Sequence, residues 1–510
     1  RSLSYDQVGT VGGIPTGLIA QNATTTMNGI DFPVRTFIQY VDDPADGVGA
    51  ADTNGITTDY KRIKVSVSYY ANGRTQTVDI ISNYAPQGLE TTTNGGTLKI
   101  SVVNANGAGV AGASVHIVNA STSPSIDLTT FSDATGVVFL PGAPTSTQYQ
   151  VAVTKNGYSS AQTYARDTTN QNPTPGYLTV VKGQTTTGTF AIDLVSTLVV
   201  NTFLPIATST FADTFSTGAN VTTLSNAVVS GGAVQLSTGS DGYSLSGNAV
   251  SVAQAPTYLA QWGVATATTS VPAGTSVRFH IVDGSGTLLP DTALPGNATG
   301  FTSSVDLSAV STSTYPSLAL SADLTTSATT TTPLLQDWSI SYARGPIPFA
   351  GVPFTLTGTK IIGSTGAGVP IYKTTISTST GATGTRSLSL EWDGYSMALG
   401  SYDTVSACNA PPYALSPGAT VTSTLMIGSS TTNMVLVNVS DTNGAVSGAS
   451  VTLSSGGYTK TLPSDSCGSA YFGGLSSGTY SVTATKTGYT TFNATGVTVS
   501  GHVFYPVPLE

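Results

Sequence analysis

Residues 435–489 read VLVNVSDTNGAVSGASVTLSSGGYTKTLPSDSCGSAYFGGLSSGTYSVTATKTGY, and the architecture of the chain can be inferred from this segment. Short runs of alternating apolar and polar residues are separated by Gly-containing turns, which is the pattern of a small antiparallel β-sandwich. Much of the rest of the chain repeats this pattern or varies it.

An earlier copy of the same unit lies near the N-terminus. Residues 103–115 (VNANGAGVAGASV) match residues 439–451 (VSDTNGAVSGASV), and both copies continue into an Asp-x-x-Gly turn. Both then end on a strand that begins with Tyr, YQVAVTKNGY in one copy and YSVTATKTGY in the other. Three matches in the same order predict a repeated module and therefore an array of modules.

The repeated unit resembles the carboxypeptidase-regulatory-like, transthyretin-like sandwiches, which include the collagen-adhesin B repeats. The resemblance covers residues 98–165 and 433–508. Residues 350–428 resemble the unit more weakly, through Gly-x-Gly-Val-Pro at 366–370 and LEWDGYSMAL at 390–399. The resemblance implies modules that are structural or displaying and that rarely catalyse a reaction.

Composition supports an all-β chain with few charges. Of the 510 residues 39% are hydrophobic but only 8% are charged, and 56 Gly and 26 Pro provide for many turns. No long apolar stretch has a 3.6-residue period, so almost no helix is expected. The net charge of −9 argues against nucleic acid as a partner, because phosphate binding needs clustered Lys and Arg.

Three features of the sequence bear on where the protein is located. They are its two cysteines, a composition typical of secreted surface proteins and the absence of a membrane-spanning stretch. Cys408 and Cys467 predict one disulfide, with two free thiols as the alternative. No run of about 20 apolar residues occurs, so no membrane span is expected. The chain starts at Arg1 without an initiator Met or a signal peptide, which indicates processing or a cut made for expression.

The chain divides into five expected units, a tandem array of β-sandwich modules after a β head. They are a pilin-like β head at 1–90, a carboxypeptidase-regulatory-like sandwich at 91–200, a jelly-roll-like sandwich at 201–345, a degenerate transthyretin-like sandwich at 346–430 and a second carboxypeptidase-regulatory-like sandwich at 431–510.

The head contains the clearest hairpin, RIKVSVSYYANGRTQTVDII at 62–81, with Asn72-Gly73 as its turn. Ile63, Val65 and Val67 are expected on one face, and the residues between them on the other. Together with SLSYDQ near the start, this segment resembles the heads of type IV pilin-like proteins. Their N-terminal pilin helix, which assembles the filament, is absent from this sequence.

An acidic, Gly-rich loop separates the two strand regions of the head. Hard oxygen ligands on a flexible backbone suit calcium, although the spacing is not that of an EF-hand. The alternative is a solvated acidic turn, because Asp and Asn are ordinary turn residues. The candidate calcium ligands are Asp42, Asp43, Asp46, Asp52, Asn54 and Asp59.

Aromatic residues in the jelly-roll unit are the candidates for glycan binding. Tyr258 and Trp262 lie four residues apart, so on one strand they would share a face. The alternative is that both Trp262 and Trp338 belong to the core, and the alternation of Trp338 with Leu334 and Ile340 favours that for Trp338.

No catalytic constellation is evident. His116, His280 and His502 fall in separate units, and His280 and Asp283, three apart on a strand, should point to opposite faces. The resemblance to collagen-adhesin B modules also implies a Lys–Asn isopeptide bond beside a carboxylate. Lys360, Glu391 and Asn409 form one such set.

The sequence therefore favours a non-enzymatic, pilin-like subunit at the cell surface, as a minor or tip pilin or an adhesin. Its partners would be other pilus subunits or a ligand on a host or neighbouring cell. The alternative is a secreted carbohydrate-binding or accessory protein that acts through the unit at 201–345.

Overall fold

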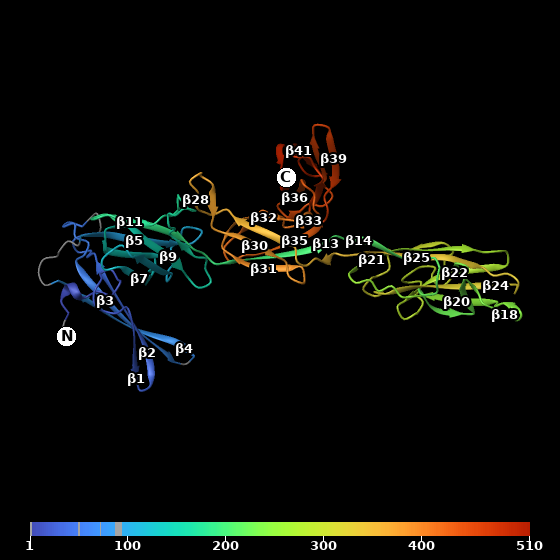
Figure 1. Cartoon of the computed structure of the whole chain (residues 1–510), viewed down its shortest axis with the longest axis horizontal. Helices are drawn as coiled ribbons and strands as arrows, with labels where there is room; N and C mark the ends of the chain where they lie inside the picture. The colour runs from blue at the N-terminus through green and yellow to red at the C-terminus, as the bar shows by residue number, and fades with distance from the viewer. Residues whose placement is uncertain (1–2, 49–51, 72, 87–93) are drawn as a thin grey trace.

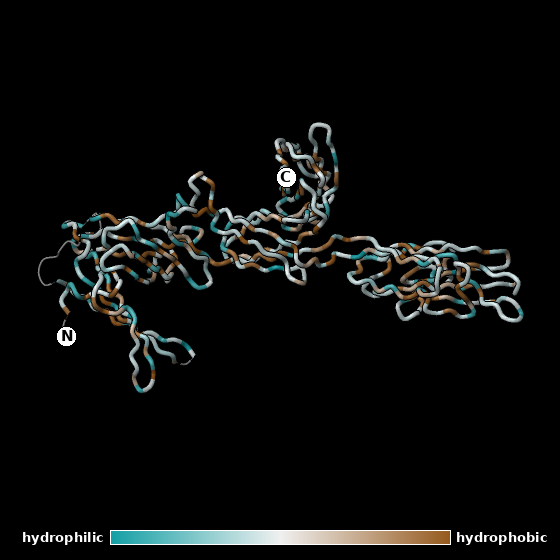
Figure 2. Tube along the Cα trace, viewed as in Figure 1, coloured by the Kyte–Doolittle hydropathy of each residue, from teal (hydrophilic) through white to brown (hydrophobic). Residues whose placement is uncertain are grey.

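The computed structural model describes residues 3–48, 52–71, 73–86 and 94–510. As predicted, the chain is an all-β protein built from β-sandwich modules, and the one helix in the described part is the 3-10 turn η1 (Tyr5–Gln7). Figure 1 shows an elongated molecule with the head at one end of its long axis and a separate sandwich at the other end. In Figure 2, apolar and hydrophilic stretches alternate along the sandwiches.

The head holds one four-stranded antiparallel sheet in the order β1-β2-β3-β4. The pair Ala71↔Arg74 closes the predicted hairpin between β3 and β4, although Asn72 lies outside the described residues. The strands are β1 (Asn22–Met27), β2 (Ile30–Val41), β3 (Tyr60–Ala71) and β4 (Arg74–Tyr84).

The first module packs the sheet β12-β5-β8 against the sheet β10-β9-β6-β7, to which β11 also pairs. Its core includes Leu98, Ile117 and Tyr149, and Ile14 of the head joins that core. The strands are β5 (Gly95–Val103), β6 (Ser114–Asn119), β7 (Ile126–Phe131), β8 (Val137–Pro144), β9 (Ser146–Thr154), β10 (Ala161–Gln162), β11 (Leu178–Val180) and β12 (Thr185–Ala191).

The last module has the same two sheets in the same order. The sheet β43-β36-β40, with β37 beside β36, faces the sheet β42-β41-β38-β39. The repeat predicted from the sequence is therefore confirmed by the topology. The strands are β36 (Met434–Asp441), β37 (Gly444–Ala445), β38 (Ser450–Ser455), β39 (Tyr458–Pro463), β40 (Ser469–Gly473), β41 (Gly478–Thr485), β42 (Phe492–Val499) and β43 (His502–Pro508).

The third module repeats this topology but is split in sequence. Its first strand, β13, lies between β35, which is parallel to it, and β31, which is antiparallel. Its second sheet has the order β30-β27-β32-β34. The strands are β13 (Ser196–Leu204), β26 (Ile347–Pro348), β27 (Pro353–Gly358), β28 (Ile361–Ser364), β29 (Pro370–Tyr372), β30 (Thr375–Ser379), β31 (Thr385–Leu390), β32 (Asp393–Leu399), β33 (Tyr402–Cys408), β34 (Tyr413–Leu415) and β35 (Thr420–Ser429).

The expected boundaries around residue 200 are therefore wrong. The boundary at 200/201 falls inside β13, which continues to Leu204. In all three modules the first and last strands are parallel neighbours, β5 with β12, β13 with β35 and β36 with β43. The third module lacks its first strand unless residues 196–204 are included.

The jelly-roll-like unit is an insertion into the third module, between β13 and β26. Its two antiparallel sheets enclose a core that contains Trp262 and Trp338. The strands are β14 (Ala207–Asp213), β15 (Val221–Ser225), β16 (Ala227–Ser230), β17 (Ala233–Leu236), β18 (Thr238–Gly239), β19 (Gly242–Tyr243), β20 (Ser246–Ser251), β21 (Leu259–Ser270), β22 (Thr275–Asp283), β23 (Ser304–Asp306), β24 (Leu318–Thr326) and β25 (Leu334–Arg344). We call this unit the insert.

A two-stranded ribbon connects the insert to the third module. On the module side Leu204 pairs with Ile347, and on the insert side Ala207 pairs with Arg344. Between these pairs run Pro205 and Ile206 on one strand and Gly345 and Pro346 on the other. The backbone at Gly345 has φ +121°, a conformation that glycine adopts readily and other residues rarely.

The first and third modules are held together by backbone hydrogen bonds. The hairpin β28–β29 leans on the loop before β11, where Gln171 N and Asn172 N donate to Ser364 O (3.1 Å each) and Thr174 N donates to Ile362 O (3.0 Å). A Cβ on Gly363 would lie 2.0 Å from the Asn170 side chain, so the approach requires glycine there. This contact fixes the two modules against each other.

No helix of the described residues is long and apolar enough to cross a membrane.

Candidate functional site

The two faces of the head sheet differ in character. Residues that pair directly in antiparallel strands share a face, and alternate residues along a strand do so as well. The register therefore places one set of apolar side chains together, which we call the apolar head face. It consists of Met27, Ile30, Phe32, Val34, Val65, Val67, Tyr69, Val78 and Ile80.

The opposite face carries a polar network along β3 and β4. Lys64 Nζ lies 2.8 Å from Asp79 Oδ2, and Ser66 Oγ donates to Asp79 Oδ1 at 2.6 Å. Ser68 Oγ and Thr77 Oγ1 are 3.1 Å apart. The division of the hairpin into an apolar and a polar face, predicted from its alternation, is confirmed.

The N-terminal segment covers only the base of the sheet on the apolar side. The Tyr5 ring lies 5.4 Å from the Tyr84 ring, and Lys61 Nζ donates to Tyr5 O and Val8 O at 2.6 and 2.7 Å. Burial lowers the pKa of Lys61 to about 8, with Asp6 opposing the shift. Ile38, at this base, is fully buried.

The remainder of the apolar head face is uncovered. Met27, Ile30, Val78 and Ile80 are 62%, 57%, 53% and 64% exposed. In Figure 1 the β1–β2 and β3–β4 hairpins project away from the first module, and no other part of the chain that the structure describes lies over them. With strands about 4.8 Å apart and about 3.4 Å per residue, the uncovered area is roughly 400 Å². A patch of that size is in the range of the largest apolar patch on a typical monomeric protein, and such patches are often functional.

The acidic loop beside the head sheet stabilises its own turns. Asp59 Oδ2 accepts from Asp43 N, and Asn54 Nδ2 donates to Asp46 Oδ2 at 2.9 Å. Asp52 Oδ1 accepts from Asn54 N at 2.9 Å.

Two of the six candidate calcium ligands, Asp42 and Asp59, are buried. Residues 49–51 of the loop lie outside the described residues. Among those that are described, no three His, Cys, Asp or Glu side chains are grouped so that they could hold a metal ion. Calcium binding therefore stays a prediction.

The glycan site expected in the insert is wrong at Trp262. Trp262 is fully buried, and its Nε1 donates to Tyr315 O at 2.9 Å, so it has no surface to offer a sugar. Tyr258 is 53% exposed, but it precedes β21 and has φ 56°, so the two residues are not neighbours on one strand face. Trp338 is buried in the core, as expected.

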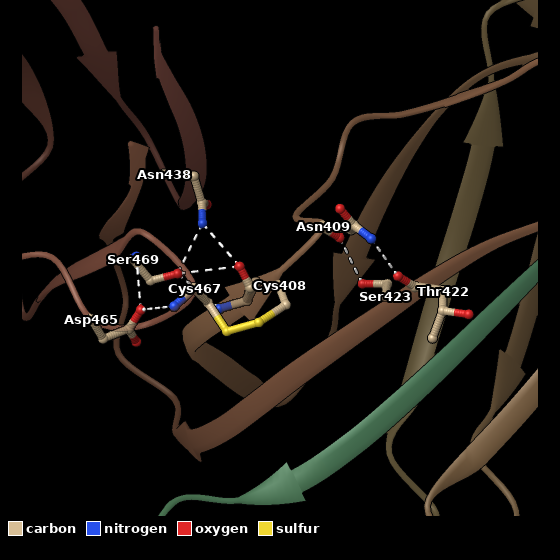
Figure 3. Close-up of a disulfide and its surroundings, with 9 residues drawn as sticks. Cys408, Asn409, Thr422, Ser423, Asn438, Asp465, Cys467 and Ser469 are labelled. Carbon is tan, nitrogen blue, oxygen red and sulfur yellow. Dashed lines mark hydrogen bonds between the residues drawn. A yellow bond between two sulfur atoms is a disulfide. The ribbon is translucent and has the colours of Figure 1, made fainter. Parts of the chain in front are cut away.

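The third and last modules are joined directly to each other, and the predicted disulfide lies at this joint. Cys408 at the end of β33 and Cys467 form the predicted disulfide, with a Cα–Cα distance of 4.7 Å (Figure 3). Around it Asn438 Nδ2 donates to Ala407 O (3.0 Å), and Ser469 Oγ accepts from Ala407 N (2.9 Å).

Strand β36 contributes to two cores at this joint. Val435, Val437 and Val439 pack into the last module, whereas Met434 and Leu436 pack into the core of the third module. Burial of both faces of one strand leaves no layer of water between the modules. The joint is therefore a continuous core and not a linker.

A buried carboxylate lies in the same joint. Asp403 of β33 is fully buried; its Oδ2 accepts from Thr431 Oγ1 (2.7 Å) and from Tyr471 Oη, and its Oδ1 lies 3.1 Å from His502 Nε2. Burial, with the hydrogen bond to Asp403, raises the pKa of Tyr471 to about 12. These side chains come from four separate sequence regions, and periodicity gave no signal for them.

The remaining candidates, one histidine pair and one lysine set, do not assemble into a reactive group. His280 Nδ1 lies 2.6 Å from Asn297 O, whereas Asp283 accepts hydrogen bonds in its own turn, so the two do not meet, as expected. Lys360 Nζ is 3.2 Å from Glu391 Oε2, whereas Asn409 Nδ2 donates to Thr422 O beside the disulfide (Figure 3). The proposed isopeptide set is thus not assembled.

Instead, Glu391 binds two lysines at the joint with the first module. Lys373 Nζ lies 2.7 Å from Glu391 Oε2 and also donates to Ser160 O (2.6 Å). Lys360 Nζ lies 3.5 Å from the centre of the Trp392 ring. This cluster adds charge-assisted contacts to the joint and offers no nucleophile–base pair.

Comparison with known proteins identifies one module. The family model of the carboxypeptidase regulatory-like domain matches residues 435–506, which confirms the resemblance expected for the last module. None of the curated proteins matches the chain.

Three proteins of Gram-positive bacteria are among the solved structures that this chain is similar to. They are the Bacillus anthracis TIE protein (10% identity, 96% of this chain and 73% of that chain, TM-score 0.17), BcpA, the major pilin subunit of Bacillus cereus (11%, 82% and 99%, TM-score 0.15), and GBS52, the minor pilin of Streptococcus agalactiae (15%, 32% and 84%, TM-score 0.13). At these TM-scores the likeness supports no inference about this chain.

Proposed function

We propose that the chain is the extracellular part of a non-enzymatic, type IV pilin-like surface subunit, and that the apolar head face is where it assembles. The supporting observation is the uncovered apolar area at one end of the molecule. A soluble chain that leaves such a face open gains free energy when an apolar partner covers it. The partner would be a pilin helix or another pilus subunit.

The rest of the molecule would serve as a spacer and display element. The first, third and last modules are joined by backbone hydrogen bonds, a shared core and a disulfide. The insert lies at the far end of the long axis from the head (Figure 1). This arrangement suits adhesion or filament structure by a minor or tip subunit, with the insert held away from the cell.

Assembly through the apolar head face can be tested with matched substitutions in cells that carry the whole gene. Ile80→Asp places a charge on the apolar head face, and Thr77→Asp places one on the polar face of the same strand. We expect Ile80→Asp to reduce surface incorporation at least tenfold, measured with an antibody against the insert, and Thr77→Asp to leave it unchanged. Equal incorporation of both variants would exclude this face.

The type IV assignment is tested by the reading frame upstream of Arg1. We expect a prepilin-type cleavage site followed by an apolar helix of roughly 20 residues. A conventional signal peptide in that place would reject the type IV pilin assignment and leave the head as a further β module.

Calcium binding by the acidic loop is a secondary proposal, supported by the five aspartates that lie between β2 and β3. Calcium should raise the melting temperature of the head, and Asp46→Asn should remove that rise. A melting temperature that is the same with calcium and with a chelator would reject the proposal.

A further inference from the structure

The outer face of the first module holds a shallow groove that the proposed function does not use. It lies on the sheet β10-β9-β6-β7, where Val151 and Val153 point into the core and the alternate residues Gln150 and Ala152 point outward. The groove has a volume of about 340 Å³. Its lining includes His116, Gln150, Ala152, Gln162, Tyr164 and Tyr177.

Four polar groups in this groove are available to a ligand. Within the described part of the chain, the side-chain amides of Gln150 and Gln162 and the hydroxyls of Tyr164 and Tyr177 make no hydrogen bond. Strand pairing brings these side chains together on one side of β9. There Gln162 pairs with Ala152, and Leu178, the residue after Tyr177, pairs with Tyr149.

The far rim of the groove carries a polar pair. His116 Nε2 lies 2.7 Å from Asp127 Oδ1, and both side chains remain accessible to solvent. The floor between this pair and the tyrosines is small and apolar, because Ala152 and Val118 point outward there. The groove thus has two partly buried aromatic rings on one wall, uncharged amides beside them, and the His116–Asp127 pair across a short apolar floor.

These features select a particular ligand chemistry. Aromatic rings and an apolar floor favour a ligand with a flat C–H surface, whereas amides and hydroxyls without a partner in the protein favour one with hydroxyl groups at its edge. The volume lies at the small end for ligand clefts. We propose that this groove binds a neutral saccharide of one or two sugar rings, with the rings of Tyr164 and Tyr177 against its C–H face.

This inference goes beyond the proposed function and does not rest on it, because the groove lies on the first module and not on the apolar head face. The structure places it in the part of the molecule that is held rigid by the third module. A failure of pilus assembly would therefore leave saccharide binding intact, and the two outcomes are distinguishable with the purified chain.

The test is a glycan array probed with the purified chain, followed by titration of the best-bound saccharide. The array carries neutral mono- and disaccharides of glucose, galactose, mannose and N-acetylhexosamines, with a proline-rich peptide beside them. We expect Gln150→Ala and Tyr177→Ala each to weaken binding at least tenfold. Gln148→Ala is the matched control, because Gln148 lies on the same strand but does not line the groove, and it should bind as the unchanged chain does.

Three results would overturn the proposal. One is the absence of binding to every saccharide on the array. Another is saccharide binding that Gln150→Ala and Gln162→Ala both leave unchanged. Gln162 is exposed, so its substitution tests the groove even where the Tyr177→Ala variant fails to fold. The third is binding of the proline-rich peptide alone, which would assign the groove to an extended peptide, since aromatic-lined grooves also recognise that conformation.

Discussion

The third module makes two very different joints, one with the last module and one with the insert. The first joint shares β36 between two cores, buries Asp403 and is closed by a disulfide. The second is a ribbon of two strands with Gly345 and Pro346 on one side. A joint made of a shared core can change angle only by unpacking, whereas a ribbon can bend at unpaired residues.

One sandwich topology can therefore act as a rigid spacer in the last module and as the support of an inserted domain in the third. The last module connects its first strand to β38 through a short turn, whereas the third module connects β13 to β27 through the whole insert. Because that connection lies at the surface, an added domain does not disturb the core. The following predictions test the contrast between a fused joint and a ribbon joint.

Removal of the disulfide should have the largest effect. The bond closes a loop with a sequence separation of 59 residues, for which loop entropy predicts a contribution of about 4 kcal/mol. The double variant Cys408→Ser with Cys467→Ser should therefore lower the free energy of unfolding of the third and last modules by that amount in urea titrations. Reduction of the unchanged chain should have the same effect, and a loss below about 1 kcal/mol would show that the shared core alone fuses the joint.

Asp403→Ala should destabilise the same joint by about 3 kcal/mol, because Tyr471, Thr431 and His502 lose a buried charged acceptor. Urea titration measures this change. The control Asp306→Ala removes an exposed carboxylate that accepts hydrogen bonds in a turn of the insert, and it should cost less than about 1 kcal/mol. Equal effects of the two substitutions would argue against a stabilising role for the buried carboxylate.

Alkaline pH should weaken the joint with the last module through Tyr471. Its folded-state pKa of about 12 lies above the ordinary value of 10.0, so the folded state holds this proton more tightly than the unfolded state does. The stability that Tyr471 contributes is complete below pH 10 and is lost as the pH rises toward 12. Tyr471→Phe should show a smaller decline across that range in melting experiments, and an identical decline would assign it to other tyrosines.

Deletion of the insert should have the smallest effect. Leu204 and Ile347 are already paired, so residues 205–346 can be replaced by Asn-Gly, which closes two-residue hairpins. The melting temperature of the remaining body should stay unchanged, with a stability change below about 0.5 kcal/mol. A large loss would show that the insert supports the third module.

Local pattern was enough to predict the first and last modules and the head hairpin. In those regions the alternation, the turns and the Tyr-started strands lie within one short stretch, and the structure keeps them as neighbours. The division of the hairpin into an apolar face at Val65 and Val67 and a polar face at Ser66 and Ser68 follows from period-two alternation alone.

The split of the third module could not be found in this way. Its first strand and β27 are separated by the insert, so no local window contains both, and β13 pairs with strands far along the chain. For the joint between the third and last modules, one signal was available in the sequence. The run Met434 to Val437 is apolar without alternation, which is typical of a strand with both faces buried.

The candidate sites depended on side-chain surroundings that sequence spacing does not determine. Trp262 satisfies its indole N–H inside the core, and the register of β21 shifts between Trp262 and Ala265, so spacing misjudged its face. Asp403 and His502 meet only because two modules share a core.

The pairing of Ala207 with Arg344 means that the insert enters and leaves the third module at one point. When the molecule is pulled between its head and its last module, the tension runs through β13 and its neighbours and bypasses the insert. The insert can therefore keep its fold under a force that strains the first, third and last modules. A ligand bound to the insert would instead pull on both strands of the ribbon together.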